Sequence, residues 1–394
     1  MILNLPILNP EIQEFITANI DKKISKLALK KNPFPDVEWI SILNQIEAKI
    51  KSKDKLPNWF ATKNIIYPSK ISVEQTSSEK TAAYKAGFIS GNSLIDLTGG
   101  FGVDDYYFAK KIKTVVHCEI NTELSKIVKH NFEQLGIKNI ACCTGDSIET
   151  LTTLNTKWDW IYIDPSRRND AKGKVFLLKD CLPNVPENLN LIFKYSNNIL
   201  IKTAPLLDIT AGLSELKNVK TIYIVAVDNE VKELLWVLNK NYNEEIEIKT
   251  VNLLKENNEY FEFILGKNNE ISTYSLPHNY LYEPNSAIMK SGGFDEVSTF
   301  YNLNKLHKHS HLYTNSSIIE FPGRVFEIEN TIPYNKIEMK KFLEGTKSNI
   351  TIRNFHDTVE IIRKKWKIKA GGNQYCFFTT DANDKKIVLI CKKL

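Results

Sequence analysis

The chain has 394 residues, more than one ordinary domain holds, so we expect two or three domains. Its net charge is +6, and its 42% hydrophobic and 25% charged residues are typical of a globular protein, with no apolar run long enough to span a membrane. The first residues lack a secretory signal pattern, and the six cysteines form no C-x-x-C pair. We therefore expect a cytoplasmic protein with reduced thiols, no metal site and no membrane association.

Residues 1–85 are predicted to form a helical region. Apolar residues recur at helical spacing between Ile12 and Leu27, and a second helix is expected over residues 37–50. The pattern breaks at residues 56–60, and Ser77 or Ser78 then stands where it would cap the next helix.

Residues 86–270 are predicted to form a Rossmann-like α/β domain with seven strands. Apolar strand candidates alternate with stretches such as residues 122–135 and 230–238, which we expect to be helices. The strand candidates are residues 93–97, 114–119, 140–144, 158–163, 199–202, 221–227 and 260–265. This alternation is typical of a doubly wound parallel sheet, in which ligands bind outside the carboxyl ends of the strands.

Residues 271–315 are predicted to be a small mixed segment, followed by a small α+β module over residues 316–394. That module holds 15 lysines and arginines against 9 acidic residues, an excess as large as that of the whole chain. Within it, Arg363, Lys364 and Lys365 precede Trp366, so the basic side chains would contact phosphates and the indole would stack on a base. The alternative is a solvated basic helix face with Trp366 packed inward.

The first strand candidate of the α/β domain ends in a glycine-rich turn. The run from Asp96 to Asp104 reads Asp-Leu-Thr-Gly-Gly-Phe-Gly-Val-Asp, so the candidate binding residues are Asp96, Thr98, Gly99, Gly100, Gly102 and Asp104. Glycines allow positive φ and a close approach of the backbone to a ligand. A dinucleotide-binding turn would read G-x-G-x-x-G, and two acids would repel a pyrophosphate. The turn instead favours a ligand with a cationic amino acid end, such as S-adenosylmethionine.

Two further acids follow the next two strand candidates. Glu119 ends the second strand and is placed to accept hydrogen bonds from ribose hydroxyls. Asp146, followed by Ser147, comes after the third strand and could accept the exocyclic amine of adenine. Each acid alone could simply cap a loop or helix. Their common register at strand ends favours a cofactor site.

The fourth strand candidate ends in Asp164-Pro165-Ser166-Arg167-Arg168, and here the chain resembles class I methyltransferases. Many of those enzymes carry an Asp/Asn-Pro-Pro-aromatic run at this point. The resemblance implies that Asp164 and the adjoining carbonyl orient the acceptor toward the methyl group, with Pro165, Ser166 and Arg167 completing the catalytic run. The chain departs from the family pattern because Ser166 replaces the second proline and Arg167 replaces the aromatic residue that stacks on the base.

An Asp-Pro-x-Arg run is similar to that of uracil-5 methyltransferases, which use a cysteine nucleophile just after the fifth strand. The fifth strand here leads through Lys202 to Pro205 without a cysteine, and Cys181 precedes it. A covalent mechanism is therefore disfavoured, and direct transfer to nitrogen or oxygen is expected, with a base nitrogen favoured. Lys202 and Arg168 are candidate substrate contacts. The two arginines could hold a phosphate or instead pair with acids of the sheet.

Over almost its whole length the chain resembles one bacterial family of class I methyltransferases with a ferredoxin-like insert and a THUMP-like C-terminal domain. The matching runs are E-Q-T-S-S-E over 74–79, D-L-T-G-G-F-G-V-D over 96–104, Y-I-D-P-S-R-R over 162–168, Y-E-P-N-S-A-I-M-K over 282–290, H-L-Y-T over 311–314, F-P-G-R-V-F over 321–326 and T-I-R-N-F over 351–355. The resemblance implies S-adenosylmethionine as cofactor and, by analogy with THUMP domains, an RNA partner such as tRNA or rRNA. In related RNA methyltransferases the segment around Ser78 folds over the cofactor.

Three hypotheses follow, in decreasing order of preference. The first is a methyltransferase that acts on RNA. The second is a methyltransferase that acts on a small molecule or a protein. The third is a non-catalytic RNA adaptor that binds S-adenosylmethionine. This hypothesis is motivated by the departures from the family pattern in residues 164–168, which we call the acceptor run. A NAD-dependent dehydrogenase is a remote fourth because the turn lacks G-x-G-x-x-G.

Overall fold

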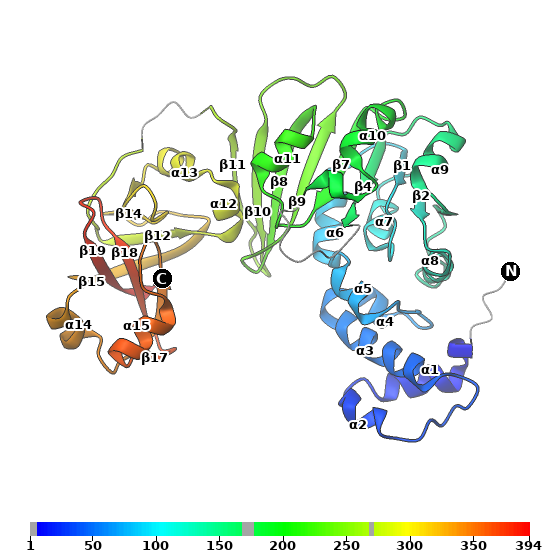
Figure 1. The fold of residues 1–394 in the computed structure, drawn as a ribbon, viewed down its shortest axis with the longest axis horizontal. Helices are drawn as coiled ribbons and strands as arrows, with labels where there is room; N and C mark the ends of the chain where they lie inside the picture. The colour runs from blue at the N-terminus through cyan, green and yellow to red at the C-terminus, as the bar shows by residue number, and fades with distance from the viewer. Residues whose placement is uncertain (1–5, 168–176, 268–271) are drawn as a thin grey trace. The chain divides into compact units, whose positions relative to one another are not determined.

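A computed structural model describes residues 6–167, 177–267 and 272–394 of the protein. The chain divides into two compact units. Unit 1 comprises Met1–Lys220 and Leu235–Asn243, and unit 2 comprises Thr221–Leu234 and Glu244–Leu394. Figure 1 shows the helices and strands of both units along the chain. Among the described residues, no helix is both long and apolar enough to cross a membrane.

Unit 1 begins with the helices that the sequence predicts for the first 85 residues. After a 3-10 turn at Pro6–Leu8 they are α1 (Pro10–Ala18), α2 (Ile24–Ala28), α3 (Trp39–Lys55), α4 (Pro57–Ala61), α5 (Lys70–Gln75) and α6 (Glu79–Ala86). The expected break at residues 56–60 is itself a short helix, because Pro57 is tolerated in a first helical turn, where its missing N–H is not needed. Helices α3, α4 and α5 lie side by side in Figure 1.

The N-terminal helices are anchored on two helices of the sheet region, α7 (Val103–Phe108) and α8 (Thr122–Gln134). Trp59 is fully buried, and its ring lies 4.8 Å from the ring of Tyr106, centroid to centroid. The side chain of Asn131 on α8 accepts a hydrogen bond from the backbone N–H of Ile66 (2.9 Å) and donates one to its carbonyl (2.8 Å). The helical region therefore packs beside the glycine-rich turn.

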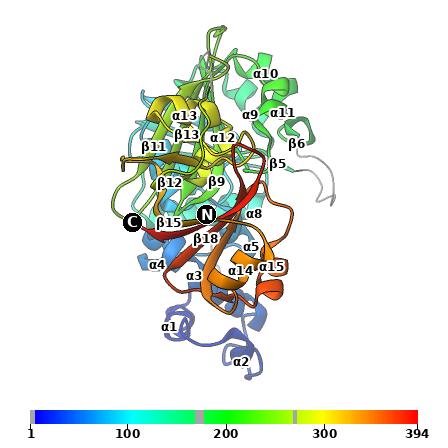
Figure 2. The ribbon, with the colours of Figure 1, turned by 90° about the vertical axis from the view of Figure 1, so that its left-hand side faces the viewer.

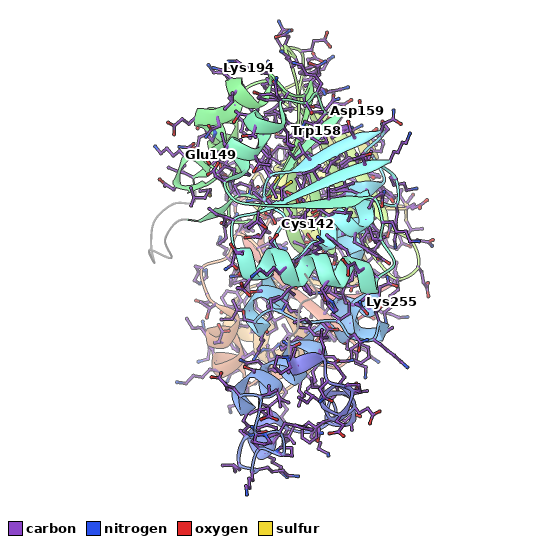
Figure 3. All side chains as sticks on the ribbon, turned by 90° about the vertical axis from the view of Figure 1, so that its right-hand side faces the viewer. Cys142, Glu149, Trp158, Asp159, Lys194 and Lys255 are labelled. Atoms are coloured by element: carbon purple, nitrogen blue, oxygen red, sulfur yellow. The ribbon has the colours of Figure 1, made fainter. Side chains whose placement is uncertain are left out.

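Five strands of the sheet in unit 1 run parallel to one another, as predicted. They are β1 (Ser93–Asp96), β2 (Thr114–Glu119), β3 (Ile140–Thr144), β4 (Trp160–Ile163) and β7 (Asn198–Thr203), paired in the order β3-β2-β1-β4-β7. Between them lie α7, α8, α9 (Ser147–Leu154), η2 (Leu178–Asp180) and α10 (Val185–Ile192), and α11 (Ile209–Glu215) follows β7. In Figure 3, α8 lies along β3, where Cys142 is labelled. The labels of Trp158 and Asp159 mark the amino end of β4, opposite the edge where ligands bind in such sheets.

Residues 230–238, predicted to be a helix, form a strand instead. Strand β8 (Val219–Val227) is followed by Asp228 and Asn229, whose φ values of 49° and 64° are typical of a two-residue hairpin turn. Strand β9 (Glu230–Asn239) follows directly. The prediction was wrong because valines and leucines at helical spacing belong to a run that is buried from Glu233 to Leu238, which periodicity does not distinguish from a buried helix.

Unit 2 also contains a strand that the sequence analysis missed. Strand β10 (Glu247–Leu253) pairs in parallel with β8 and antiparallel with β11 (Glu259–Ile264). Its sequence, Glu-Ile-Lys-Thr-Val-Asn-Leu, shows no continuous alternation of apolar and polar residues, because Lys249 and Thr250 are adjacent.

A second sheet in unit 2 carries the C-terminal part of the chain. Its strands, in spatial order, are β13 (Asn304–Lys305), β14 (Tyr313–Asn315), β12 (Tyr280–Pro284), β15 (Gly323–Pro333), β19 (Lys386–Lys393), β18 (Gln374–Thr380), β16 (Lys347–Ile352) and β17 (Lys369–Ala370). Its helices are α12 (Ser286–Ser291), α13 (Phe294–Tyr301), α14 (Lys336–Phe342) and α15 (Val359–Trp366). Helices α14 and α15 pack on strands β18 and β19 through a shared apolar core (Figure 2). The C-terminal region is thus a mixed α+β module, as predicted.

Candidate active site

A cavity of about 400 Å³ opens at the carboxyl ends of the parallel strands of unit 1. The predicted residues that line it are Asp96, Thr98, Gly99, Gly100, Asp104, Glu119, Asp146, Ser147, Asp164 and Ser166. The wall also contains residues that the sequence analysis did not single out, including Ser72, Gln75 and Thr76 at α5, Ile120 after β2, and the neighbours Leu182 and Pro183. The structure therefore brings the ends of four strands and one N-terminal helix to a single cavity.

The glycine-rich turn is shaped by close packing on its protein side. The N–H of Gly99 donates to the carbonyl of Cys118 (2.8 Å), and a Cβ at Gly99 would overlap the ring of His117. Gly100 has a φ of 55°, and a Cβ there would make only an ordinary contact with the carbonyl oxygen of Thr98 (3.6 Å). Gly102, with a φ of 76°, caps α7 and would overlap Phe132 if it carried a Cβ. Gly99 and Gly100 line the cavity, while Gly102 serves the packing of α7 against α8.

Thr98 joins the ends of β1 and β4. Its backbone N–H and its hydroxyl both donate to Oδ1 of Asp96, at 2.7 and 3.0 Å. The same hydroxyl accepts a hydrogen bond from the backbone N–H of Asp164 (2.6 Å). The glycine-rich turn therefore sets the position of the acceptor run.

A buried aspartate–histidine pair that the sequence analysis missed lies beneath the turn. Nδ1 of His117 and Oδ2 of Asp105 are 2.6 Å apart, and both side chains are fully buried. Burial, and then the neighbouring Asp105, raises the pKa of Asp96 well above its usual range. Burial likewise raises the pKa of Asp105 and lowers that of His117. The Asp-Asp doublet at 104–105 is the only signal in the sequence, and it does not reveal which acid turns inward.

Asp104 carries the charge of the inner wall. Its Oδ2 accepts hydrogen bonds from the hydroxyls of Ser77 (2.8 Å) and Tyr162 (2.7 Å), and its Oδ1 lies 3.2 Å from the ammonium of Lys85. Burial opposes ionisation of this carboxyl, but Lys85 and Lys202 outweigh it, so the pKa of Asp104 is below its ordinary value. The neighbouring Ser78, a predicted cofactor contact, is not on the cavity wall, since its side chain caps α6 by accepting from the N–H of Thr81 (3.2 Å).

The two acids after β2 and β3 have structural partners of their own. The carboxylate of Glu119 accepts hydrogen bonds from the backbone N–H groups of Gly100 (3.0 Å) and Asn121 (2.7 Å). Asp146 caps α9, because its Oδ1 accepts from the N–H groups at the start of that helix, at 2.9 Å each. An ionised carboxylate has about four acceptor positions, so both residues keep capacity to accept from a ligand in the cavity.

The acceptor run lies at the mouth of the same cavity. Asp164 is 37% exposed at its side chain and forms an ion pair with Lys202 of β7, which is 11% exposed. Ser166 belongs to the short strand β5 (Ser166–Arg167), which pairs with β6 (Cys181–Leu182) and so brings Leu182 to the wall. Pro165 is buried beside it. Of Arg167 only the backbone is described, and Arg168 lies outside the described residues.

The basic stretch of α15 belongs to unit 2 and is only partly available to a substrate. Trp366 is 6% exposed and packs in the core of the C-terminal module, so the predicted stacking of its indole on a base is wrong. Arg363 is half-buried and donates to the carbonyls of Ser348 (3.1 Å) and Ile368 (3.4 Å). Lys364 and Lys365 are exposed.

Comparisons with known proteins include a solved structure that matches almost the whole chain. A ferredoxin-like domain model matches residues 280–322, and a THUMP domain-like model matches residues 323–393. A crystal structure from Porphyromonas gingivalis W83, named a "putative methyltransferase", is 31% identical, with 97% of each chain covered and a TM-score of 0.87. No match is found among curated proteins.

Other structures match about two fifths of the chain. An rRNA methylase from Streptococcus thermophilus is 15% identical over 41% of this chain and 94% of its own, with a TM-score of 0.31. TrmK from M. capricolum, solved with S-adenosyl-homocysteine, is 18% identical over 41% of this chain and 68% of its own, with a TM-score of 0.32.

Proposed function

This chain belongs to the same family as the Porphyromonas gingivalis protein whose crystal structure is named a "putative methyltransferase", and from that premise we propose that it transfers a methyl group from S-adenosylmethionine to RNA. The observation that carries the proposal is the cavity at the strand ends, which gathers Asp104, Glu119 and Asp146 around the glycine-rich turn, next to Asp164. The second candidate, a methyltransferase for a small molecule or protein, shares the cofactor site and differs only in the acceptor.

The cavity fits the cofactor in size and in chemistry. Its volume of about 400 Å³ lies within the range of about 300–1,000 Å³ that is usual for small-molecule sites. A Cβ placed on Gly145 would meet nothing within 4 Å, so the backbone there is open to a ligand. The charged residues of the described wall are all acidic, which suits the ammonium, hydroxyls and exocyclic amine of S-adenosylmethionine better than a pyrophosphate.

Each acid has a proposed role. Asp104, held anionic by Lys85, attracts the amino acid end, with Thr98, Gly99 and Gly100 beside it and Asp96 beneath. Glu119 accepts from the ribose hydroxyls, and Asp146 with Ser147 receives the adenine end. Ile120 is 71% exposed on the wall and offers an apolar face to the adenine ring. Ser78 and Gly102 act indirectly, through α6 and α7.

The acceptor side requires alignment rather than a covalent nucleophile. Once bound, the cofactor supplies an electrophilic methyl group, and attack along the carbon–sulfur axis needs mainly proximity and orientation. Asp164 and the adjoining carbonyl orient the acceptor, with Pro165, Ser166 and Arg167 completing this part of the wall. Cys181 is fully buried, and its thiol lies 3.6 Å from the carbonyl of Leu177, which supports direct transfer. The sequence-based preference for a base nitrogen stays a prediction.

RNA is proposed as the substrate because of the C-terminal module. The THUMP domain-like match covers the region in which the positive charge of the chain is concentrated. Lys364 and Lys365 are exposed on α15 and are the residues of the basic stretch best placed to contact phosphates. The RNA species (tRNA or rRNA), the cytoplasmic location and the domain boundaries at residues 85, 270 and 315 stay predictions.

The test is transfer of labelled methyl from S-adenosylmethionine to total RNA from cells that lack the gene. We expect label in RNA with the wild type, a loss of about 10²-fold or more with Asp164→Ala, and wild-type transfer with the exposed control Asp36→Ala. Absence of label in RNA, with cofactor binding demonstrated in parallel, would contradict the proposal. Salt-insensitive transfer to a small molecule or a protein would favour the second candidate.

A further inference from the structure

The acceptor end of the cavity contains an ion pair rather than a lone carboxylate. Asp164 lines the cavity, and its Oδ2 is engaged by the ammonium of Lys202, which lies behind it on β7. A second pair joins Asp104, which lines the same cavity, to the ammonium of Lys85. Each of these two wall carboxylates is therefore paired with one lysine, and the formal charge of each pair is zero.

An amine acceptor and a hydroxyl acceptor make opposite demands on such a site. An amine becomes positively charged as its nitrogen forms the bond to methyl, so a nearby cation raises the energy of its transition state. A hydroxyl gives up its proton as its oxygen forms that bond, so it benefits from a proton acceptor and a cation side by side. Asp164 and Lys202 are such a combination.

The shape of the wall favours the same acceptor. The aromatic residues lining the described part of the cavity are Phe101 and Tyr162, and both are buried. The hydroxyl of Tyr162 donates a hydrogen bond to Asp104, and Phe101 packs against Trp59 in the core. Among residues 6–167 and 177–267, the wall near Asp164 consists of Ser166, Leu182 and Pro183, none of which is aromatic. These small and aliphatic side chains suit a sugar.

We infer that the acceptor is a hydroxyl group, the ribose 2′-hydroxyl of RNA, rather than the base nitrogen that the sequence favours, and that Asp164 orients it while Lys202, paired with that carboxylate, supplies the nearby positive charge. The inference rests on the proposed function and names its acceptor atom. The ribose oxygen forms a bond to the methyl carbon while the carbon–sulfur bond breaks, and its electron pair stays on sulfur to give S-adenosylhomocysteine. The hydroxyl proton passes to the free oxygen of the Asp164 carboxylate and then to solvent. No further reactant is needed.

The decisive experiment locates the label in the product. RNA methylated by the full-length protein is hydrolysed with alkali, which cleaves the chain only where a 2′-hydroxyl is free. We expect the label in alkali-resistant dinucleotides. Label in mononucleotides would place the methyl group on a base and overturn the inference while leaving the proposed function intact. Absence of label in RNA would overturn both.

A variant series tests the role of Lys202 independently of the product. Lys202→Met should lower kcat for methyl transfer by about 10²-fold, as for loss of one group that stabilises developing oxyanion charge, which is a larger effect than the one expected on the Kd of S-adenosylmethionine. Lys202→Arg keeps the charge and should recover part of the loss, and the exposed Lys217→Met is the matched control. An unchanged kcat for Lys202→Met, or no recovery with arginine, would contradict the role of the cation.

Discussion

The cavity of unit 1 and helix α15 of unit 2 both contain charged residues that the sequence analysis named as candidates, but the two regions are built in different ways. In the cavity, acids that are 8 to 68 residues apart along the chain, from Asp96 to Asp164, converge at the carboxyl ends of parallel strands. In α15, four consecutive residues diverge: Trp366 and part of Arg363 turn to the core, while two lysines face solvent. A parallel sheet gathers residues distant in sequence, whereas a helix separates neighbours by about 100° each.

The largest effect is expected where the site depends on a buried charge pair. Asp104→Asn leaves the fully buried Lys85 without its carboxylate and should lower the free energy of unfolding by about 3–5 kcal/mol. Adding Lys85→Met removes the uncompensated charge, so the double variant should be more stable than Asp104→Asn alone. Chemical denaturation of the three proteins measures this. A double variant less stable than the single one would show that the pair does not act as a unit.

A comparably large effect is expected from the tryptophan that the sequence offered as a base-stacking residue. Trp366→Ala should destabilise the protein by about 3 kcal/mol, because the indole is buried with Ile362 and Met339 in the core of the C-terminal module. Thermal unfolding measures the loss. Trp366→Phe should retain most of the stability. Weaker RNA binding by Trp366→Ala at unchanged stability would restore the stacking interpretation.

The exposed lysines of α15 should behave in the opposite way. Replacing Lys364 and Lys365 together by alanine should lower the free energy of unfolding by at most about 1 kcal/mol, because both side chains are exposed and the contacts of Lys365 with Tyr334 and Asp357 lie at the surface. RNA binding should weaken, and the slope of log Kd against log salt should fall by up to about 2 if both lysines contact phosphates. Filter binding at several salt concentrations tests this, with Lys30 and Lys31, exposed in unit 1, as the matched alanine control. An unchanged slope would exclude α15 from the RNA interface.

The smallest expected effect is a pH dependence of stability that arises from Asp104 in the cavity of unit 1. The pKa of Asp104 is lower in the folded protein than in the unfolded chain, because Lys85 and Lys202 outweigh its burial. Such a group contributes stability above its unfolded pKa of about 4, and the contribution is lost as pH falls through the lower folded value. Denaturation between pH 6 and the acid limit should therefore show a smaller loss for Asp104→Asn than for the wild type. A parallel loss in both proteins would show that other carboxyl groups dominate.

Several elements could be predicted because their signals are local. The glycine-rich turn after β1, the strands β2 and β3 and the cap at Ser78 depend on residues close together in the chain. The same holds for the acids at the strand ends, since the end of a strand can be read from the sequence and parallel strands end at one edge. Strand β9 was mistaken for a helix because its continuous burial carries no period that distinguishes the two.

The sequence by itself determined the type of sheet, the turn at Gly99 and Gly100, and the set of acids available to a cofactor. Only the tertiary structure decided which acid is paired with which lysine, that Leu182 comes back to the wall beside Ser166, and that Trp366 points into a core. The physical reason is range: turns and periodicity act between near neighbours, whereas ion pairs and burial depend on which segments the fold brings together. Lys202 shows this most clearly, because neither its type nor its neighbours in the chain reveal that it faces Asp164.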